Sequence, residues 1–312
     1  MAEHKPYIVS INVSPEKGTV KKAVCLAALS PGGIVNDAHA GAWHRQVSLL
    51  GQDQIDDFEK KLGRKLEPGA FGENLALGGI NLDQVALFDR FLVNGAELEV
   101  TQIGKACHND GCAIFRQVGS CIMPKKGLFC RVLKGGKIAS GDRVEHLPYH
   151  FRIAVFTLSD RASSGIYEDR SGPEIRKTLE EYFRDRRDRV EYDCRVLPDD
   201  REQLRTELVR VRDDGYDLVF TTGGTGIGTR DWTPDVVSGL ADKIIPGIME
   251  HIRLKYGHDC PQCLLSRSVA AVMGMTMVFA LPGSVRAVRE YLLEILPLLA
   301  HMRLMIHGID DH

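Results

Sequence analysis

The sequence has few cysteines, no long apolar run and no start that resembles a secretory signal peptide. Eight cysteines in 312 residues are too few for a disulfide-stapled fold, which favours a reducing compartment. The longest apolar candidate, residues 275–283, is interrupted by Pro282 and Gly283 and is much shorter than the roughly 18 residues of a membrane span. We therefore expect a soluble, cytoplasmic protein that does not bind membranes.

The chain also lacks an excess of charge of either sign. A formal net charge of −2 argues against nucleic acid as a partner, because nucleic-acid-binding surfaces normally carry a basic excess. The composition, with 44% apolar and 26% charged residues, predicts packed cores. The length of 312 residues allows two domains of roughly 150 residues each.

The two halves of the sequence have different textures. Residues 1–148 contain short β-like runs at 7–13, 22–29, 84–93 and 96–103, and one clear helical segment at 51–63, which predicts a β-rich, barrel-like domain. Residues 149–312 alternate strand and helix patterns. This alternation predicts an α/β domain with a doubly wound, mostly parallel sheet.

Polar and glycine-rich residues follow each of the four strands that we predict in the second half. In a doubly wound sheet, ligands bind beyond the carboxyl ends of the strands, so these residues outline one cleft. They are Ser159, Asp160 and Arg161; Pro198, Asp199 and Asp200; Thr222, Gly223, Gly224, Thr225 and Gly226; and Pro282, Gly283 and Ser284.

The glycine loop, residues 222–231, does not match two known phosphate-binding motifs. A Walker A element would need Lys and then Ser or Thr where Thr229 and Arg230 stand, and a dinucleotide-binding fingerprint would need its third glycine at Thr229. Its amides still suit a phosphate, and Thr233 with Pro234 predicts a cap and a first-turn proline for the next helix. An anionic ligand also needs counter-charge, for which the neighbouring candidates are Arg161, Arg230 and Arg267.

Two carboxylates narrow the chemistry of this cleft. Asp199 and Asp231 come from neighbouring loops, and Mg²⁺ is typically held by one or two carboxylates together with phosphate oxygens. A purely structural role for Asp231 in its turn is the alternative. Asp200, three residues before Gln203, is interpreted as a helix cap, and Ser284 as the cap of the final helix.

The second half closely resembles the MogA/MoaB family of molybdopterin adenylyltransferases. The matching segments are SDRASSGIYEDRSGP, VLPDD, TTGGTG, RDWTPD, LLSR and LPGS. The resemblance implies that ATP and the terminal phosphate of molybdopterin react with Mg²⁺ to give adenylylated molybdopterin and pyrophosphate. It places the family's two acidic residues on Asp199 and Asp231, adds Ser266 and Arg267 to the substrate-binding set, and implies a trimer or hexamer.

The first half resembles the MOSC domain, the carboxyl-terminal module of molybdenum-cofactor sulfurases. The segments are DAHAGAWHRQVSLL, FGENL, IGKACH, CIMPKKGLFCRV and GDRVE. The resemblance implies a β-rich domain that carries sulfur or binds the cofactor through a cysteine. Cys107 is our first choice because Lys105 and His108 favour its thiolate, and Cys121 is the second. Cys25 and Cys130 lie in strand-like runs and are expected to be buried.

Three other features of the sequence have open interpretations. Cys260 and Cys263 form a single CxxC, which could be a redox pair or half a metal site. A zinc site is a weaker alternative for Cys107, His108, Cys112 and Cys121. A polar cluster is either a cofactor contact or a surface turn; its members are Asp37, His39, Trp43, His44 and Arg45.

We thus predict a protein of molybdenum-cofactor biosynthesis that adenylylates molybdopterin. Its cofactors and ligands would be Mg²⁺, ATP and molybdopterin, and its partners other proteins of cofactor assembly or molybdoenzymes. Two further hypotheses remain open: a non-catalytic cofactor carrier and a sulfurtransferase centred on Cys107.

Overall fold

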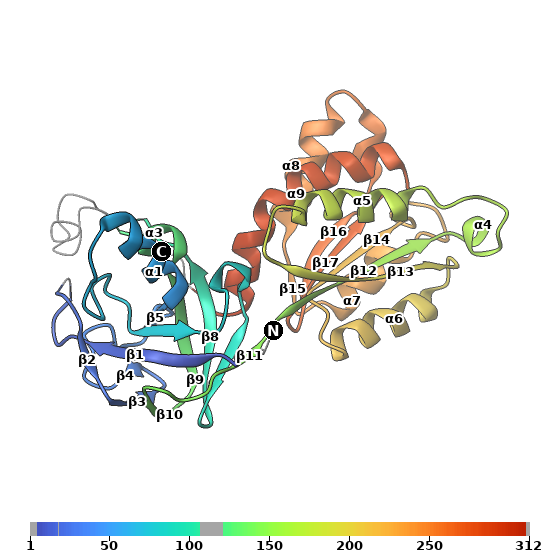
Figure 1. Ribbon diagram of the computed structural model, residues 1–312. Coiled ribbons are helices and arrows are strands. Elements are labelled where there is room, and N and C mark those ends of the chain that lie inside the picture. Colours follow the sequence, from blue (N-terminus) through green and yellow to red (C-terminus); the bar gives the residue numbers. More distant parts are fainter. Residues whose placement is uncertain (1–4, 18, 107–120, 310–312) are drawn as a thin grey trace. The chain divides into compact units, whose positions relative to one another are not determined.

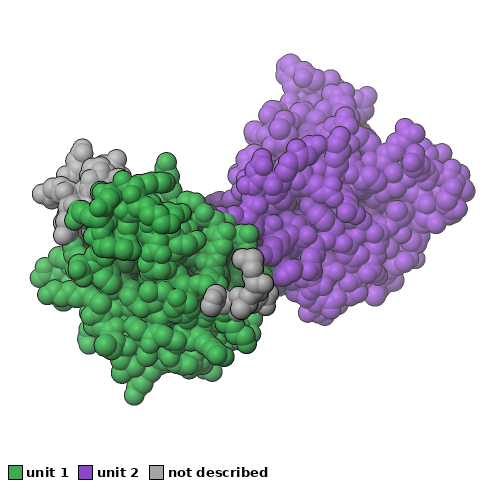
Figure 2. All heavy atoms as spheres, viewed as in Figure 1, with its two compact units in different colours: residues 1–149, 309–312 green, residues 150–308 purple. Residues whose placement is uncertain are grey.

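A computed structural model describes residues 5–17, 19–106 and 121–309. The chain divides into two compact units, residues 1–149 together with Ile309 onward, and residues 150–308 (Figure 2). No helix in these described ranges is both long and apolar enough to cross a membrane.

The first unit is built mainly of strands. Its larger sheet has the order β11-β7-β8-β9-β5-β6-β1-β2, and a smaller sheet has the order β10-β3-β4 (Figure 1). The strands are β1 (Tyr7–Val13), β2 (Lys22–Val24), β3 (Leu26–Ser30), β4 (Gly33–Ile34), β5 (Val47–Gly51), β6 (Leu75–Gly78), β7 (Arg90–Val93), β8 (Ala96–Ile103), β9 (Leu128–Lys134), β10 (Gly136–Ala139) and β11 (Glu145–Leu147). Among the described residues of this unit, the helices are α1 (Gln52–Leu62), η1 (Leu82–Gln84) and α3 (Met123–Lys126).

The larger sheet curls around an apolar core. Ile8, Leu49, Leu98 and Val100 are among its buried side chains. Tyr7 of β1 forms an isolated antiparallel bridge with Arg143, two residues before β11 begins. The β-rich texture and the helix at 51–63 are confirmed. The sheet is a curled half-barrel. Between β1 and the segment before β11, both of which the structure describes, it has only this bridge and no continuous ladder.

Two predicted strands of the first unit are broken in the structure. The run at 84–93 is strand only in β7, because Phe88 has φ 69° and the buried Asp89 carboxylate accepts a hydrogen bond from the Ala86 amide. The run at 22–29 divides at Cys25 into β2 and β3, which belong to different sheets. Apolar alternation alone does not show such breaks.

The second unit has a six-stranded mixed sheet with helices on both faces. The order is β13-β12-β14-β17-β16-β15, in which the first four strands are parallel and the last two antiparallel. The strands are β12 (His150–Leu158), β13 (Arg189–Leu197), β14 (Leu218–Thr222), β15 (Lys243–Ile244), β16 (Val269–Met273) and β17 (Thr276–Leu281). The four parallel strands agree with our prediction, whereas β15 and β16 were not predicted.

Continuous apolar runs explain why the central strands of this sheet are buried on both faces. All residues of β14 and β17 are buried, as expected for central strands covered on two sides. Helices α5, α8 and α9 cover one face, and α6 and α7 the other (Figure 1). The helices are α4 (Asp160–Ser163), α5 (Ser171–Phe183), α6 (Arg201–Asp213), α7 (Thr233–Leu240), α8 (Pro246–Gly257), η3 (Pro261–Leu265) and α9 (Val285–Ile306).

Candidate functional site

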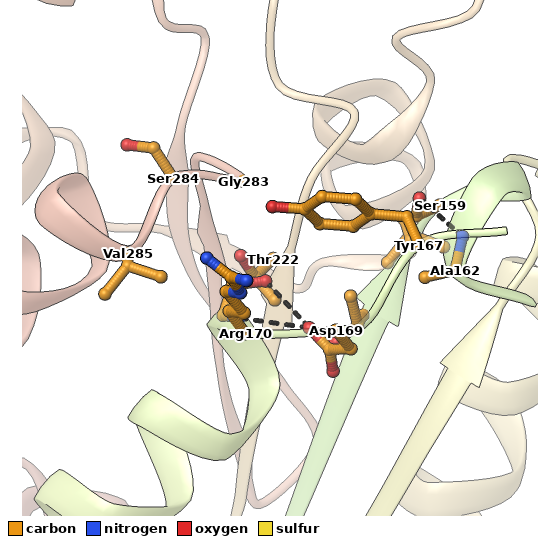
Figure 3. A pocket seen from close by; sticks show the side chains of 12 residues that line it. Ser159, Ala162, Tyr167, Asp169, Arg170, Thr222, Gly283, Ser284 and Val285 are labelled. Carbon is orange, nitrogen blue, oxygen red and sulfur yellow. Dashed lines mark hydrogen bonds between the residues drawn. The ribbon is translucent and has the colours of Figure 1, made fainter. Parts of the chain in front are cut away.

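The carboxyl ends of β12, β13, β14 and β17 lie at one edge of the second sheet, because these neighbouring strands run parallel. A cavity of about 380 Å³ opens at this edge. Ser159, Thr222, Gly283 and Ser284 line it, so three of the four predicted strand-end loops meet there (Figure 3). The fourth loop reaches this group through Asp199, described below.

The segment between α4 and α5 also lines this cavity, and our sequence analysis gave it no role. Tyr167 and Arg170 extend into the cavity opposite Ser284 (Figure 3). The guanidinium groups of Arg161 and Arg170 lie 5.4 and 6.0 Å from the centroid of the Tyr167 ring. Arg170 and the Tyr167 ring therefore line the cavity together with the strand-end loops, and Arg161 lies beside the same ring.

Asp169 fixes the end of that segment. Its carboxylate accepts hydrogen bonds from the Thr157 hydroxyl at 2.8 Å and from the Ser171 and Gly172 amides at 3.0 and 3.1 Å. It thus ties β12 to the start of α5. An aspartate two positions before the first residue of an amphipathic helix is the signal that could have revealed it.

The glycine loop needs its glycines for backbone conformation. Gly223 has φ 103° and Gly224 has φ 62°, both in the left-handed region. A Cβ on Gly223 would meet the Leu158 carbonyl oxygen at 2.4 Å, and one on Gly224 would meet the Thr233 hydroxyl at 2.6 Å. The two glycines let β14 and β12 end close together and let α7 begin beside them.

Asp160, Asp199 and Arg230 form one polar cluster. The Asp199 amide donates to Asp160 Oδ1 at 2.9 Å, and the Asp160 amide donates to Asp199 Oδ2 at 3.1 Å. Arg230 donates to the other carboxylate oxygen of Asp160. The hydrogen bond from the Asp199 amide, followed by the Arg230 guanidinium, holds the pKa of Asp160 below its ordinary value.

Asp231 has a separate partner from Asp199. Its Oδ2 accepts a hydrogen bond from the Gly228 amide at 2.7 Å, within its own loop. The structural role that we gave as the alternative for Asp231 is therefore present. A shared metal ion between Asp199 and Asp231 stays a prediction.

Arg267, one of our three candidates for counter-charge, is hydrogen-bonded to the glycine loop. Its guanidinium donates to the Gly226 carbonyl at 2.8 Å and to both carboxylate oxygens of Asp235 at 3.0 Å, and it also donates to the Asp231 carbonyl. The Arg267 amide donates to the Thr225 carbonyl. Arg267 thus positions the loop, and Arg230 is likewise neutralised by Asp160.

Several predicted residues cap helices or close turns. Ser284 accepts from the Ala287 amide and Asp200 from the Gln203 amide, which confirms both caps. Ser159 accepts in the same way from the Ala162 amide. Thr233 is not a cap: it is the first residue of α7, its hydroxyl donates to the Gly223 carbonyl, and Pro234 follows in the first turn.

The remaining predicted residues join the loops to one another. The Thr222 hydroxyl donates to the Pro282 carbonyl at 2.9 Å. The hydroxyls of Thr225 and Ser266 lie 3.4 Å apart, and Ser266 also pairs with Ser268 at 2.7 Å. Pro234 is buried at the start of α7.

The cysteine predictions for the first unit fall partly outside the described residues. Cys107, Cys112 and His108 lie in residues 107–120, which the structure does not describe. Cys121 is half-buried and packs against the cluster around Leu50 and Phe71. Cys130 is buried as expected, and burial raises the pKa of its thiol. Cys25 is exposed, contrary to prediction, because it lies between β2 and β3.

The polar cluster of the first unit is centred on a buried ion pair, so it is more than a surface turn. Lys21 Nζ lies 2.5 Å from Asp37 Oδ2, and both side chains are at most 1% exposed. His39 donates its amide to Asp37 and stacks on Trp43. Burial acts to raise the pKa of Asp37, but hydrogen bonds from His39 and Lys21 hold it well below its usual range.

Two other members of this cluster have contacts of their own. The Arg45 guanidinium lies 5.0 Å from the centroid of the Trp43 ring. His44 Nδ1 lies 3.2 Å from the Thr101 hydroxyl. Both are contacts within the protein, so the predicted contact with a cofactor stays a prediction.

Cys260 and Cys263 are not joined by a disulfide bond. Burial, together with a hydrogen bond to Cys260, raises the pKa of the Cys263 thiol. Among the described residues, no group of three or more His, Cys, Asp or Glu side chains is arranged to hold a metal ion.

Comparison with known proteins assigns a family to each half. Residues 154–301 match the family described as "Probable molybdopterin binding domain", and residues 36–145 match the MOSC domain. The molybdopterin adenylyltransferase of Helicobacter pylori J99 is 34% identical over 50% of this chain and 88% of its own length. That of Escherichia coli K12 is 33% identical over 51% and 79%. The crystal structure of MoaB, a molybdopterin biosynthesis enzyme from a Thermus species, is 34% identical over 51% and 97%, with a TM-score of 0.46.

Proposed function

Because the second half of this chain belongs to the molybdopterin adenylyltransferase family and its first half carries a MOSC domain, we propose that the protein adenylylates molybdopterin during molybdenum-cofactor biosynthesis. The observation that carries the proposal is the 33–34% identity to these enzymes over most of their length. The substrates would be ATP and molybdopterin, which bears a terminal phosphate.

The chemistry of the strand-end cavity supports this proposal. Both substrates are anionic, and the cavity offers the hydroxyls of Ser159 and Ser284 together with the guanidinium of Arg170. Arg161 adds a second cation beside Tyr167. Bringing two phosphate groups together requires positioning and neutralisation of charge more than a protein nucleophile.

The residues present fit a magnesium ion. In the part of the chain that the structure describes, Asp199 and Asp231 each use one carboxylate oxygen, Oδ2, to accept a hydrogen bond, and the other oxygen accepts none. Two such oxygens suit Mg²⁺, which takes its remaining ligands from phosphate oxygens and water. When bound, Mg²⁺ would neutralise charge on the phosphates of ATP.

The reaction needs one bond to form and one to break. A phosphate oxygen of molybdopterin attacks the α-phosphorus of ATP, and the bond from that phosphorus to the oxygen bridging the β-phosphate breaks, which releases pyrophosphate. Arg161 and Arg170 would hold the attacking anion, and Arg267 would keep Asp231 and the glycine loop in place. Ser284 would contact phosphate while capping α9.

For the first unit, we propose that the MOSC domain binds, carries or sulfurates the cofactor, with Cys107 as its first candidate thiol and Cys121 as the second. Fusion of the two activities would keep a labile intermediate at high local concentration if the geometry permits transfer. A persulfide detected by mass spectrometry on the wild-type protein and absent from Cys107→Ser would support this role.

The proposed activity is tested by supplying ATP, Mg²⁺ and molybdopterin to the full chain and measuring pyrophosphate. We expect release that depends on all three and falls sharply in Asp231→Asn. Equal turnover by the wild type and this variant would remove Asp231 from the mechanism. Absence of ATP binding by the wild type would instead favour the cofactor carrier.

A further inference from the structure

A second cavity begins where the glycine loop leaves the strand-end site. It has a volume of about 450 Å³, and Ile227, Thr229, Asp231, Trp232 and Arg267 are among its lining residues. Asp231 and Arg267, two residues to which the proposed function gives a role, thus line this second cavity. The first cavity, in contrast, includes neither Asp199 nor Asp231 in its lining.

Two large apolar side chains in this cavity stay partly or mostly exposed. Trp232 is 39% exposed and Ile227 is 73% exposed, although both lie in a loop that is otherwise polar. Trp232 directly precedes α7 and does not belong to the buried cluster beneath it. Exposed aromatic and aliphatic side chains that line a cavity are typical of ligand-binding sites.

The Trp232 ring is also linked to the β13 loop. The Arg201 guanidinium lies 5.7 Å from the centroid of the indole ring, and Arg201 follows Asp199 by two residues. The indole thus brings the loop of Asp231 close to the segment that follows Asp199. A base stacked on Trp232 would lie next to Asp231, one of the two proposed magnesium ligands.

We propose that Trp232 is the stacking surface for the adenine base of ATP, with Ile227 as a further apolar contact. This assignment rests on the proposed function, since it is the reaction that calls for a nucleotide. Aromatic stacking suits adenine because every base offers a π-face. Tyr167, the exposed aromatic of the first cavity, is left for the other planar substrate, the pterin.

The sequence offers a direct spectroscopic test, because Trp232 and Trp43 are the only two tryptophans of the chain. In the full-length Trp43→Phe variant, emission reports on Trp232 alone. We expect saturable quenching by Mg²⁺-ATP and no quenching by Mg²⁺-tripolyphosphate, which has the phosphates without the base. Equal quenching by both ligands would contradict the assignment.

Substitution provides the energetic test. Trp232→Leu should weaken ATP binding, measured by calorimetry, by about 5- to 100-fold, the range typical of one lost stacking contact. Trp232→Phe should stay within a few-fold of the wild type, and the matched variant Tyr167→Leu should leave ATP binding unchanged. ATP binding by Trp232→Leu within twofold of the wild type, or a loss caused by Tyr167→Leu instead, would overturn the proposal.

Failure of this proposal and failure of the proposed function give different results. If the wild type releases pyrophosphate and Trp232→Leu keeps the wild-type KM for ATP, only the base site is wrong. If ATP quenches Trp232 but pyrophosphate is never released, the base site stands and the adenylylation is wrong. If the wild type does not bind ATP, both proposals fall.

Discussion

Asp160 and Asp199 hold each other through reciprocal hydrogen bonds, in which each backbone amide donates to the carboxylate of the other residue, at 2.9 and 3.1 Å. This pair joins the ends of β12 and β13. Because one oxygen of each carboxylate is engaged in this way, the Asp199 side chain is oriented by the backbone and keeps its second oxygen for a ligand. The hydrogen bond between the two loops thus positions Asp199 as a proposed magnesium ligand.

We predict that Asp199→Asn reduces pyrophosphate release by at least about 100-fold, because an amide oxygen is a weaker magnesium ligand than a carboxylate. The neighbouring Asp200→Asn is the matched control: Asp200 caps α6 and its change should leave turnover within twofold. Steady-state rates of pyrophosphate release by the two variants test this prediction. Similar losses in both variants would point to a disturbed loop instead of a lost metal ligand.

Gly223→Ala should destabilise the second unit by about 3 kcal/mol or more, since a left-handed φ and a collision with the Leu158 carbonyl oxygen act together. Gly165→Ala measures the cost of the left-handed backbone conformation without a steric collision. Gly165 has φ 74° with nothing within 4 Å of a Cβ, so its change should cost about 1–2 kcal/mol. Urea denaturation measures both free energies of unfolding, and equal costs would contradict the role of the close contact.

Arg267→Gln should lower the free energy of unfolding by about 1–2 kcal/mol, because the glycine loop loses its hydrogen bonds to the guanidinium. It should also raise the KM for ATP, since Asp231 is no longer positioned. Arg286→Gln, which breaks only an exposed pair with Glu290, serves as the control and should cost at most about 0.5 kcal/mol. An unchanged KM in Arg267→Gln would remove Arg267 from the site.

The buried pair in the first unit predicts a pH-dependent stability. The pKa of Asp37 is depressed in the folded protein, so its stabilising effect is fully present above the unfolded value of about 3.9 and is lost as the pH falls toward the folded value. Asp37→Asn should cost about 3–5 kcal/mol at pH 7, because Lys21 is left buried without its partner.

The difference between the wild type and Asp37→Asn should therefore shrink at pH 3, which denaturation at the two pH values can measure. Asp57→Asn, at an exposed pair with Lys60, should show no such dependence. A difference that is the same at pH 3 and pH 7 would be evidence against ionised Asp37 as the source of the stabilisation.

The sequence predicted the features that depend on local patterns. The buried strands β12, β14 and β17 follow from continuous apolar runs, and the caps at Asp200 and Ser284 follow from residue type and spacing. The carboxyl ends of these three strands lie together because the strands are parallel neighbours. These predictions needed no knowledge of distant contacts.

Other features depend on contacts between distant residues and could not be predicted in this way. Arg267 binds Asp235, 32 positions away, and Arg230 binds Asp160, 70 positions away, and local sequence patterns indicate neither ion pair. The antiparallel β16 is a short apolar segment next to a turn, which periodicity does not separate from a loop. Asp169 acquires its role only when β12 and α5 come together.

The central claim is that this protein transfers the AMP group of ATP to molybdopterin, and the most direct test follows that group. The full chain is incubated with Mg²⁺, molybdopterin and ATP labelled at the α-phosphate, and the products are identified by mass spectrometry. Our account predicts that the label appears in adenylylated molybdopterin together with one equivalent of pyrophosphate. Label found only in unreacted ATP, or in ADP and AMP without a molybdopterin adduct, would contradict it.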